Sequence, residues 1–136
     1  MMRRLTYVAL CVLAITTLVG CAAIETKARS QKLTDQVKAY TKAIRWGDFD
    51  IATRFLKHRN GKPARTEAGS LQGIRVTHYD YSIQADRPEA EEAEMVATFD
   101  YQLPSSASVR RIKQRATWWY DAKIENWYLD GDLPKF

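Results

Sequence analysis

The sequence has few of the residues that bind metals or form disulfides. It has two histidines and two cysteines in 136 residues, and it lacks the His-Glu-x-x-His pattern of many zinc enzymes. It also lacks a glycine-rich phosphate-binding loop and a Gly-x-Ser-x-Gly nucleophile elbow. We therefore expect neither a metal nor a cofactor. We interpret His58 as a cation at a helix end and His78 as a strand residue at a β-bulge.

The first twenty residues have the composition of a secretory signal. Arg3 and Arg4 precede an apolar run from Leu5 to Val19, which is short for a membrane span. The run ends in Leu18-Val19-Gly20-Cys21, which resembles the lipobox of bacterial lipoproteins. The resemblance implies cleavage before Cys21, a diacylglycerol on its sulfur and an acyl chain such as palmitate on its amino group. The alternative is an uncleaved anchor with Cys21 as an ordinary residue.

Cleavage would leave no cysteine for a disulfide. Cys11 would be lost with the signal peptide, residues 1–20, and Cys21 would carry lipid, so the core alone must hold the fold. Residues 21–136 are enough for one small domain, and they contain all four tryptophans. Losing Arg3 and Arg4 from 21 basic residues leaves 19 against 16 acidic ones. This mild positive balance weakly favours contact with anionic lipid or polysaccharide.

The lipid would fix the location of the protein. Two or three acyl chains hold a protein at a bilayer without a transmembrane helix, because each buried methylene contributes about 0.8 kcal/mol. Ala22 lies where an aspartate would resemble the retention signal for the inner membrane. The resemblance thus implies the bacterial cell envelope, at the periplasmic side of the outer membrane. We expect residues 21–30 to be a lipidated tether and residues 31–136 a single domain that binds no nucleic acid.

Apolar spacing predicts two helices at the start of this domain. From about Gln31, apolar residues recur every three or four positions, on one helical face. They are Leu33, Val37, Tyr40 and Ile44. Gly47 can end this helix, and the Asp48 carboxylate can cap a second one over about 49–57. Residues 60–70 are rich in glycine, proline and small polar types and predict a loop.

After residue 73 the apolar period changes to two, which predicts strands over about 74–85, 93–103, 111–120 and 127–129. A slip in this alternation predicts a β-bulge near His78 and Tyr79. Helices followed by hairpin-linked strands predict an α+β fold. Its two N-terminal helices pack on a curved four-stranded antiparallel sheet.

Two stretches of the chain match the ends of a known kind of domain. Ala43-Ile44-Arg45-Trp46-Gly47-Asp48-Phe49-Asp50-Ile51-Ala52 is followed by Phe55-Leu56, and Trp118-Trp119-Tyr120 is followed by Asn126-Trp127-Tyr128-Leu129-Asp130-Gly131. They resemble the helix–Gly-Asp–helix opening and the paired final strands of the nuclear-transport-factor-two-like superfamily. The resemblance implies a cone-shaped, cystatin-like α+β domain with an apolar pocket and frequent homodimerisation. The superfamily includes ketosteroid-isomerase-like and dehydratase-like enzymes and many non-enzymatic domains.

An enzyme of this kind would need a carboxylate in an apolar pocket that faces tyrosine hydroxyls. The candidates are Asp80, Asp100, Tyr79, Tyr81 and Tyr101. Strand alternation places both carboxylates on the face opposite the tyrosines. We therefore favour a non-enzymatic protein and keep the enzyme as an alternative.

Two sets of side chains are candidate sites. The first mixes cations and aromatics on the outer face of the third strand, which suits a protein partner or an acidic envelope polymer. This candidate partner-binding face comprises Arg111, Lys113, Arg115, Trp119 and Tyr128. An ordinary solvated face, balanced by Asp100 and the acidic run 89–94, is the alternative. The second set lines a pocket or the core and comprises Tyr40, Tyr81, Phe99, Tyr101, Trp118, Tyr120 and Trp127.

The sequence thus predicts a lipid-anchored periplasmic binding domain that engages a protein partner or a small apolar ligand. The two alternatives are the isomerase- or dehydratase-like enzyme and a purely structural cell-envelope protein.

Overall fold

The computed structural model describes residues 2–65 and 67–136, with side chains from residue 20 onward. The side chains of residues 1–19, in the predicted signal peptide, lie outside the described residues. Two α-helices, α1 (Met2–Trp46) and α2 (Phe49–Thr53), precede a 3-10 helix, η1 (Ala68–Leu71). Four strands follow, and they are β1 (Arg75–Gln84), β2 (Glu92–Gln102), β3 (Arg110–Asp121) and β4 (Asn126–Asp130).

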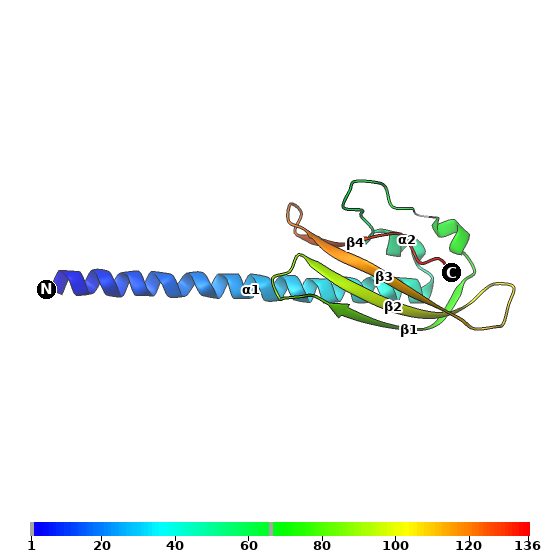
Figure 1. Cartoon of the computed structure of the whole chain (residues 1–136), viewed down its shortest axis with the longest axis horizontal. Helices are drawn as coiled ribbons and strands as arrows, with labels where there is room; N and C mark the ends of the chain where they lie inside the picture. The colour runs from blue at the N-terminus through cyan, green and yellow to red at the C-terminus, as the bar shows by residue number, and fades with distance from the viewer. Residues whose placement is uncertain (1, 66) are drawn as a thin grey trace.

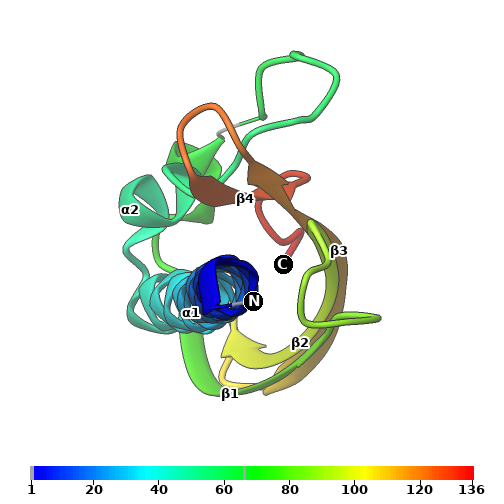
Figure 2. The same ribbon diagram turned by 90° about the vertical axis from the view of Figure 1, so that its left-hand side faces the viewer.

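The four strands form one antiparallel sheet in the order β1-β2-β3-β4. Viewed along α1, the sheet curves around the helix, and α2 lies beside it near β4 (Figure 2). The predicted fold class is confirmed: two helices pack on a curved four-stranded antiparallel sheet. This is the cone-shaped arrangement that the family resemblance implies.

The end of α1 follows from Gly47. This residue has φ +76°, in the left-handed region that glycine tolerates best. The amides of Gly47 and Asp48 donate to the carbonyls of Ile44 and Ala43 over 3.2 and 2.9 Å, which closes the last helical turn. The predicted side-chain cap is wrong: Asp48 precedes α2, but its carboxylate makes no capping hydrogen bond, and α2 ends at Thr53 instead of Lys57.

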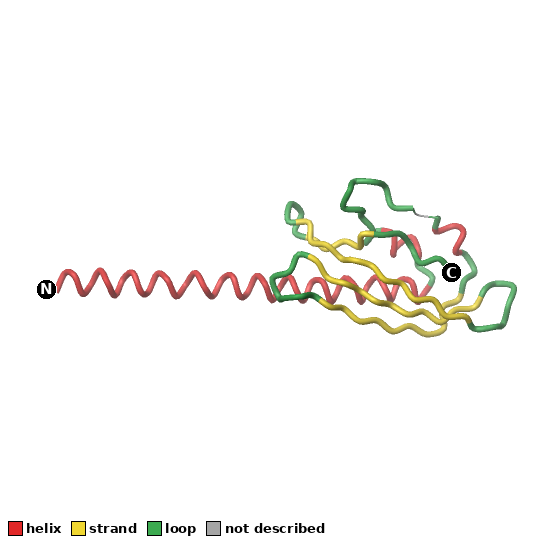
Figure 3. Tube along the Cα trace, viewed as in Figure 1, coloured by secondary structure: helices red, strands yellow, loops and turns green. Residues whose placement is uncertain are grey.

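Helix α1 also runs through residues 21–30, which the sequence predicts as a tether (Figure 3). Residues 20–25 are exposed, but the Arg29 guanidinium lies 4.3 Å from the centroid of the Tyr120 ring. The Arg29 carbonyl accepts a hydrogen bond from Trp127 Nε1 over 3.1 Å. The packed part of α1 therefore begins near residue 29. Since the core begins at Leu33, residues 22–136 contain every residue of the core cluster.

The β-bulge lies one residue earlier than predicted. The register of β1 on β2 shifts between Val76 and His78, so Thr77 is the extra residue. His78 consequently pairs with Asp100 on the outer face. The alternation of Ile74, Val76 and His78 in the sequence predicts one shared face for the three residues, and this is wrong for His78, because the slip precedes it.

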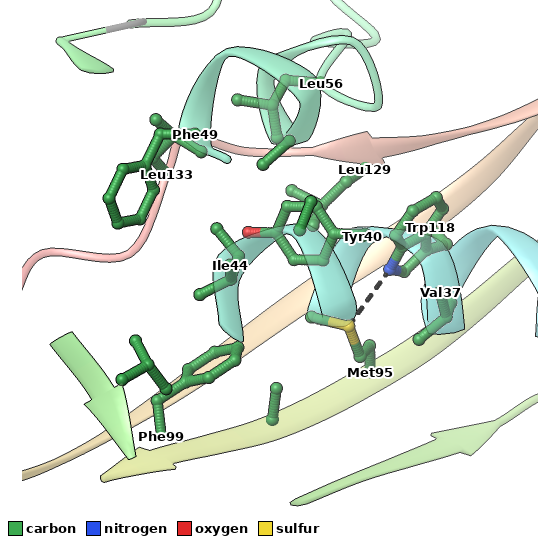
Figure 4. Close-up of a cluster of buried hydrophobic side chains, with 14 of the residues drawn as sticks. Val37, Tyr40, Ile44, Phe49, Leu56, Met95, Phe99, Trp118, Leu129 and Leu133 are labelled. Carbon is green, nitrogen blue, oxygen red and sulfur yellow. Dashed lines mark hydrogen bonds between the residues drawn. The ribbon is translucent and has the colours of Figure 1, made fainter. Parts of the chain in front are cut away.

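The core fills the space between α1 and the concave face of the sheet (Figure 4). Its largest fully buried side chains are Trp118, Trp127, Tyr40 and Phe99. Tyr40 and Trp118 meet edge to face with ring centroids 5.9 Å apart. In the part of the chain that the structure describes, no helix has the length and apolar character needed to cross a membrane.

Candidate functional site

A cavity of about 480 Å³ lies at the end of the cone where α1 terminates. Its wall comes from the loop before β1, the start of the β2–β3 loop and the segment after β4. The lining residues are Arg65, Glu67, Ser70, Leu71, Gln72, Ile74, Leu103, Pro104, Asp132, Leu133, Pro134, Lys135 and Phe136. We call this the mouth cavity. Its volume lies in the usual range of small-molecule sites, about 300–1,000 Å³.

Phe136 forms the boundary between the mouth cavity and the core. Its ring packs edge to face on Tyr101 with centroids 4.9 Å apart, and it lies 6.1 Å from both Phe99 and Phe49. Side chains of the core cluster lie on its inner side, among them the fully buried Phe99. The mouth cavity is therefore a shallow site at the end of a filled cone.

The close approach of two loops shapes one wall of the mouth cavity. Gly73, with φ +84°, precedes β1, and a Cβ there would lie 2.8 Å from Cγ of Pro104. A side chain at this position would therefore have to push the β2–β3 loop outward.

His58 ties the loop after α2 to the segment after β4. Lys57 N donates to Leu129 O over 3.0 Å, and Leu129 N donates to Phe55 O over 2.8 Å, which places this loop against the outer edge of β4. The pairing brings His58 Nδ1 to 3.1 Å from Asp130 Oδ1 and His58 Nε2 to 3.1 Å from Asp132 Oδ1. We call these three residues the histidine clasp.

The clasp has clear electrostatic consequences. Hydrogen bonding to Asp132, helped by Asp130, raises the pKa of His58 above its ordinary value, although partial burial opposes the shift. The pKa of Asp132 is lowered, first by the Arg65 amide, which donates to its Oδ1 over 2.9 Å, and further by His58. His58 was predicted to be a cation at the end of α2. In the structure it instead bridges the loop after α2 to Asp130 and Asp132.

A chain of hydrogen bonds connects the clasp with the core. Tyr40 Oη donates to Gln114 Oε1 over 3.0 Å, and Gln114 Nε2 donates to the carbonyl of Asp132 over 3.2 Å. Burial raises the pKa of Tyr40, so its hydroxyl stays protonated and can donate. The position of Asp132 is therefore fixed from inside the cone.

The predicted pocket or core lining lies mostly in the core. Five of its members are buried, namely Tyr40, Phe99, Tyr101, Trp118 and Trp127. Tyr81 and Tyr120 are half-buried. Tyr81 stacks on Tyr79 with centroids 6.4 Å apart, and Tyr120 lies under Arg29. Tyr101 and Phe99 approach the mouth cavity, each through its ring contact with Phe136.

The cations of the predicted partner-binding face lie on the outer face of β3, and two of them are paired. Arg111 Nε and Nη2 donate to the two oxygens of Asp100 over 2.6 and 2.9 Å. Arg115 lies 3.5 Å from Glu94. Lys113 is exposed between them. Pairing neutralises much of the charge of this strand, as the solvated-face interpretation expects.

The aromatic members of the same face form a separate cluster. Trp119 and Tyr128 have ring centroids 6.0 Å apart, and the Trp119 indole donates to the Lys57 carbonyl over 2.8 Å. Lys57 Nζ lies 5.5 and 5.0 Å from the two ring centroids, and the Arg59 guanidinium lies 5.6 Å from Trp119. The sequence analysis missed Lys57 and Arg59. They lie in a loop, and a loop has no periodic pattern from which its contact with β3 could be predicted.

The candidate carboxylates lie on the sheet face opposite the tyrosines, as strand alternation predicts. Asp80 is exposed, and Asp100 is bound by Arg111 on the outer face. Tyr101 is buried on the opposite face, against Phe136. In residues 20–65 and 67–136, no group of three or more histidine, cysteine or acidic side chains is arranged to hold a metal ion.

Sequence reasoning missed the mouth cavity because three segments far apart in the chain build it. The apolar residues after the last strand, Leu133 and Phe136, were the available signal. Leu133 is buried in the core cluster, and Phe136 packs against it. Their burial shows that the segment after β4 is part of the domain.

No family model and no curated protein matches the sequence. Among solved structures, the chain is similar to a calcium/calmodulin-dependent protein kinase type II association domain from Thiobacillus denitrificans, with a TM-score of 0.46 and 11% identity. The likeness covers 74% of this chain and 93% of that chain. It carries no functional argument, and the fold described above rests on the helices and strands themselves.

Proposed function

We propose that this protein is a lipid-anchored, non-enzymatic binding domain of a bacterial cell envelope, which holds a small apolar ligand in the mouth cavity. The observation that carries the proposal is the contrast between a filled cone and an open cavity at its end. Apolar side chains of Leu71, Ile74 and Leu103 line that cavity beside polar ones. Such a mixture is typical of small-molecule sites.

The position of the mouth cavity along α1 supports a role at a membrane surface. Cys21 and Trp46 lie on the same helix, so a rise of 1.5 Å per residue separates them by about 38 Å. A lipid on Cys21 would hold the opposite end of the cone at the bilayer (Figure 1). The mouth cavity would then open away from the membrane, toward the periplasm if the outer membrane is the site of anchoring.

The positions of the carboxylates support a binding role over the isomerase- or dehydratase-like alternative. General base catalysis beside a carbonyl needs a carboxylate in reach of the substrate and a donor opposite to it. Asp100 is bound to Arg111, and the Tyr40 hydroxyl is bound to Gln114 inside the filled core. The mouth cavity has the carboxylates of Asp132 and Glu67, but no tyrosine is among its lining residues. Asp132 Oδ1 already accepts from the Arg65 amide and lies beside His58.

The binding proposal can be tested with a neutral apolar dye. We expect residues 22–136 to bind Nile red, and we expect Ser70→Trp, which fills the mouth cavity from an exposed position, to abolish saturable binding. Ser82→Trp, at an exposed position of β1, is the matched control and should bind like the unchanged protein. Equal dye binding by both variants would exclude the mouth cavity as the site.

The anchor has its own test in cells. Cys21→Ser removes the thiol that the lipobox resemblance requires, so we expect loss of labelling by a fatty-acid probe and accumulation of the uncut precursor. Retained labelling would refute lipidation at Cys21. Fractionation of the labelled protein between inner and outer membranes then tests the location implied by Ala22.

A second candidate function is the docking of a protein partner on Trp119 and Tyr128. The observation that favours it is the pairing of two aromatic rings with Lys57 and Arg59 on a partly exposed surface, since tryptophan, tyrosine and arginine dominate binding hot spots. Homodimerisation would be one form of such docking, and light scattering of the purified protein measures it. A purely structural envelope protein would show neither dye binding nor a partner.

A further inference from the structure

We infer that the histidine clasp is a proton-controlled latch on the wall of the mouth cavity, so that ligand binding there depends on the protonation of His58. The inference rests on the proposed function for its ligand. Its structural part, the opening of the loop that carries Arg65, stands on the geometry of the clasp alone.

The geometry of the clasp requires a charged imidazole. Each ring nitrogen of His58 lies 3.1 Å from a carboxylate oxygen, one of Asp130 and one of Asp132. A carboxylate can only accept, and a neutral imidazole has a single N–H to donate. Loss of the proton therefore leaves one lone pair of the ring facing a carboxylate, and one of the two links becomes repulsive.

The surroundings of the clasp determine which side moves. Asp130 lies in β4, and the Asp132 carbonyl is bound to Gln114, which in turn is bound to the buried Tyr40. These links fix the two carboxylates. The side that can move is the loop over 58–65, which is exposed at most of its positions.

The charged groups around His58 are the two aspartates and two arginines. Arg59 donates its amide to Asp130 over 3.3 Å, and its side chain pairs with Glu92 of β2. Arg65 donates its amide to Asp132 over 2.9 Å. Both amides keep their protons at all relevant pH values. His58 is therefore the group in this set whose charge changes near neutrality.

The latch couples to the mouth cavity through its wall. Arg65 and Asp132 both line the cavity, so the protonated clasp holds the two sides of that wall together. Loosening of the loop leaves the wall less preorganised, and a ligand must then order it on binding. We expect affinity to be highest on the acidic side of the His58 titration and to fall by about fivefold or more across it.

The test follows three quantities in residues 22–136 as the pH is raised through neutrality. They are the His58 ring signals in NMR, the protection factors of the 59–65 amides, which correct for the rise of intrinsic exchange with pH, and the affinity for Nile red, a neutral dye. We expect the pKa of the ring to lie above its ordinary value of 6.5, and the protection factors and the affinity to fall with the same midpoint. His58→Gln, whose amide cannot become charged, should flatten both curves.

Two further variants make the result decisive. His78→Gln changes the other histidine, on the outer face of β1, and should leave both curves unchanged. Asp132→Asn keeps His58 but removes its main partner, so the midpoint should move down toward 6.5. This variant also decides the outcome if His58→Gln does not fold.

Each outcome separates the latch from the binding proposal. The latch is refuted if His58 titrates without a change in the protection factors over 59–65, or if these factors still change with pH in His58→Gln. If the loop opens as the pH rises but dye binding does not change, only the coupling between the latch and the mouth cavity is refuted. Failure of the dye to bind at any pH refutes the proposed ligand site, while ring titration and exchange still decide on the latch.

Discussion

The indole Nε1 of Trp118 points at the sulfur of Met95, 3.4 Å away, across the centre of the core. Both side chains are fully buried, and they come from paired strands, β3 and β2. A tryptophan N–H usually needs a partner when it is buried, and the polarisable thioether supplies a weak acceptor without adding a strongly polar group. This contact lets the largest aromatic residue of the cone lie wholly inside it.

Trp118 should therefore contribute strongly to stability. We expect Trp118→Ala to lower the free energy of unfolding by about 3–5 kcal/mol, because it removes a buried ring and leaves a cavity. Trp46 is the matched control, since 66% of its side chain is exposed, and Trp46→Ala should cost less than about 1 kcal/mol. Urea titration of residues 22–136 measures both. A similar loss in the two variants would contradict the filled core.

Adding a methyl group at Gly47, where α1 ends, should lower the stability of the fold. At φ +76° an alanine is strained by about 1–2 kcal/mol, although Gly47→Ala has no close contact apart from Phe49 at 4.0 Å. Gly69→Ala, at a glycine with ordinary φ and open space around it, should change stability by less than about 0.5 kcal/mol. Thermal unfolding followed by circular dichroism compares the two, and equal melting temperatures would exclude strain at Gly47.

The ion pair of Arg111 and Asp100 should make the stability of the fold depend on pH in the acidic range. Hydrogen bonds from Arg111 hold the pKa of Asp100 below its ordinary value of 3.8. A lowered pKa in the folded state means that the carboxylate stabilises the fold above pH 3.8. This contribution is lost as the pH falls through the lowered value. We expect Arg111→Leu to raise the Asp100 pKa in an NMR carboxyl titration, while Arg110→Leu, a neighbouring exposed arginine, should leave it in place.

Docking on the outer face of β3 would depend on its charge. If Arg111 and Lys113 contact a partner, the double variant Arg111→Glu with Lys113→Glu should remove that partner from pulldowns of solubilised membranes. Lys57→Ala with Trp119→Ala tests the aromatic cluster in the same assay. Unchanged co-purification in the first variant and loss in the second would move the contact from the charged part to the aromatic part. Retention in both would exclude this face.

Residues close together in the sequence were the ones whose structure could be predicted. The stripe from Leu33 to Ile44, the stop at Gly47 and the inward face of β2 depend on local spacing, and the structure contains all three. The bulge was placed one residue late, because alternation alone does not distinguish Thr77 from His78 as the extra residue. The pairing with β2 decides between them.

The candidate site was the part that could not be predicted. The mouth cavity joins residues of the loop before β1, the β2–β3 loop and the segment after β4, and no pattern in the sequence connects them. His58 and Asp132 are likewise 74 positions apart in the sequence, and their hydrogen bond exists only because the loop after α2 pairs with the edge of β4. Loops lack the periodicity that shows which way a side chain faces.

The sequence by itself determined the fold class, since helical and strand periods and a left-handed glycine are local properties of the chain. It also determined that no disulfide can stabilise residues 22–136, which contain no cysteine. Tertiary structure decided that the cone is filled, that two of the strand cations are paired and that His58 lies between two carboxylates. These features depend on which side chains come into contact after the sheet has curved around α1. Apolar packing and ion pairing stabilise a structure only between groups that are in contact.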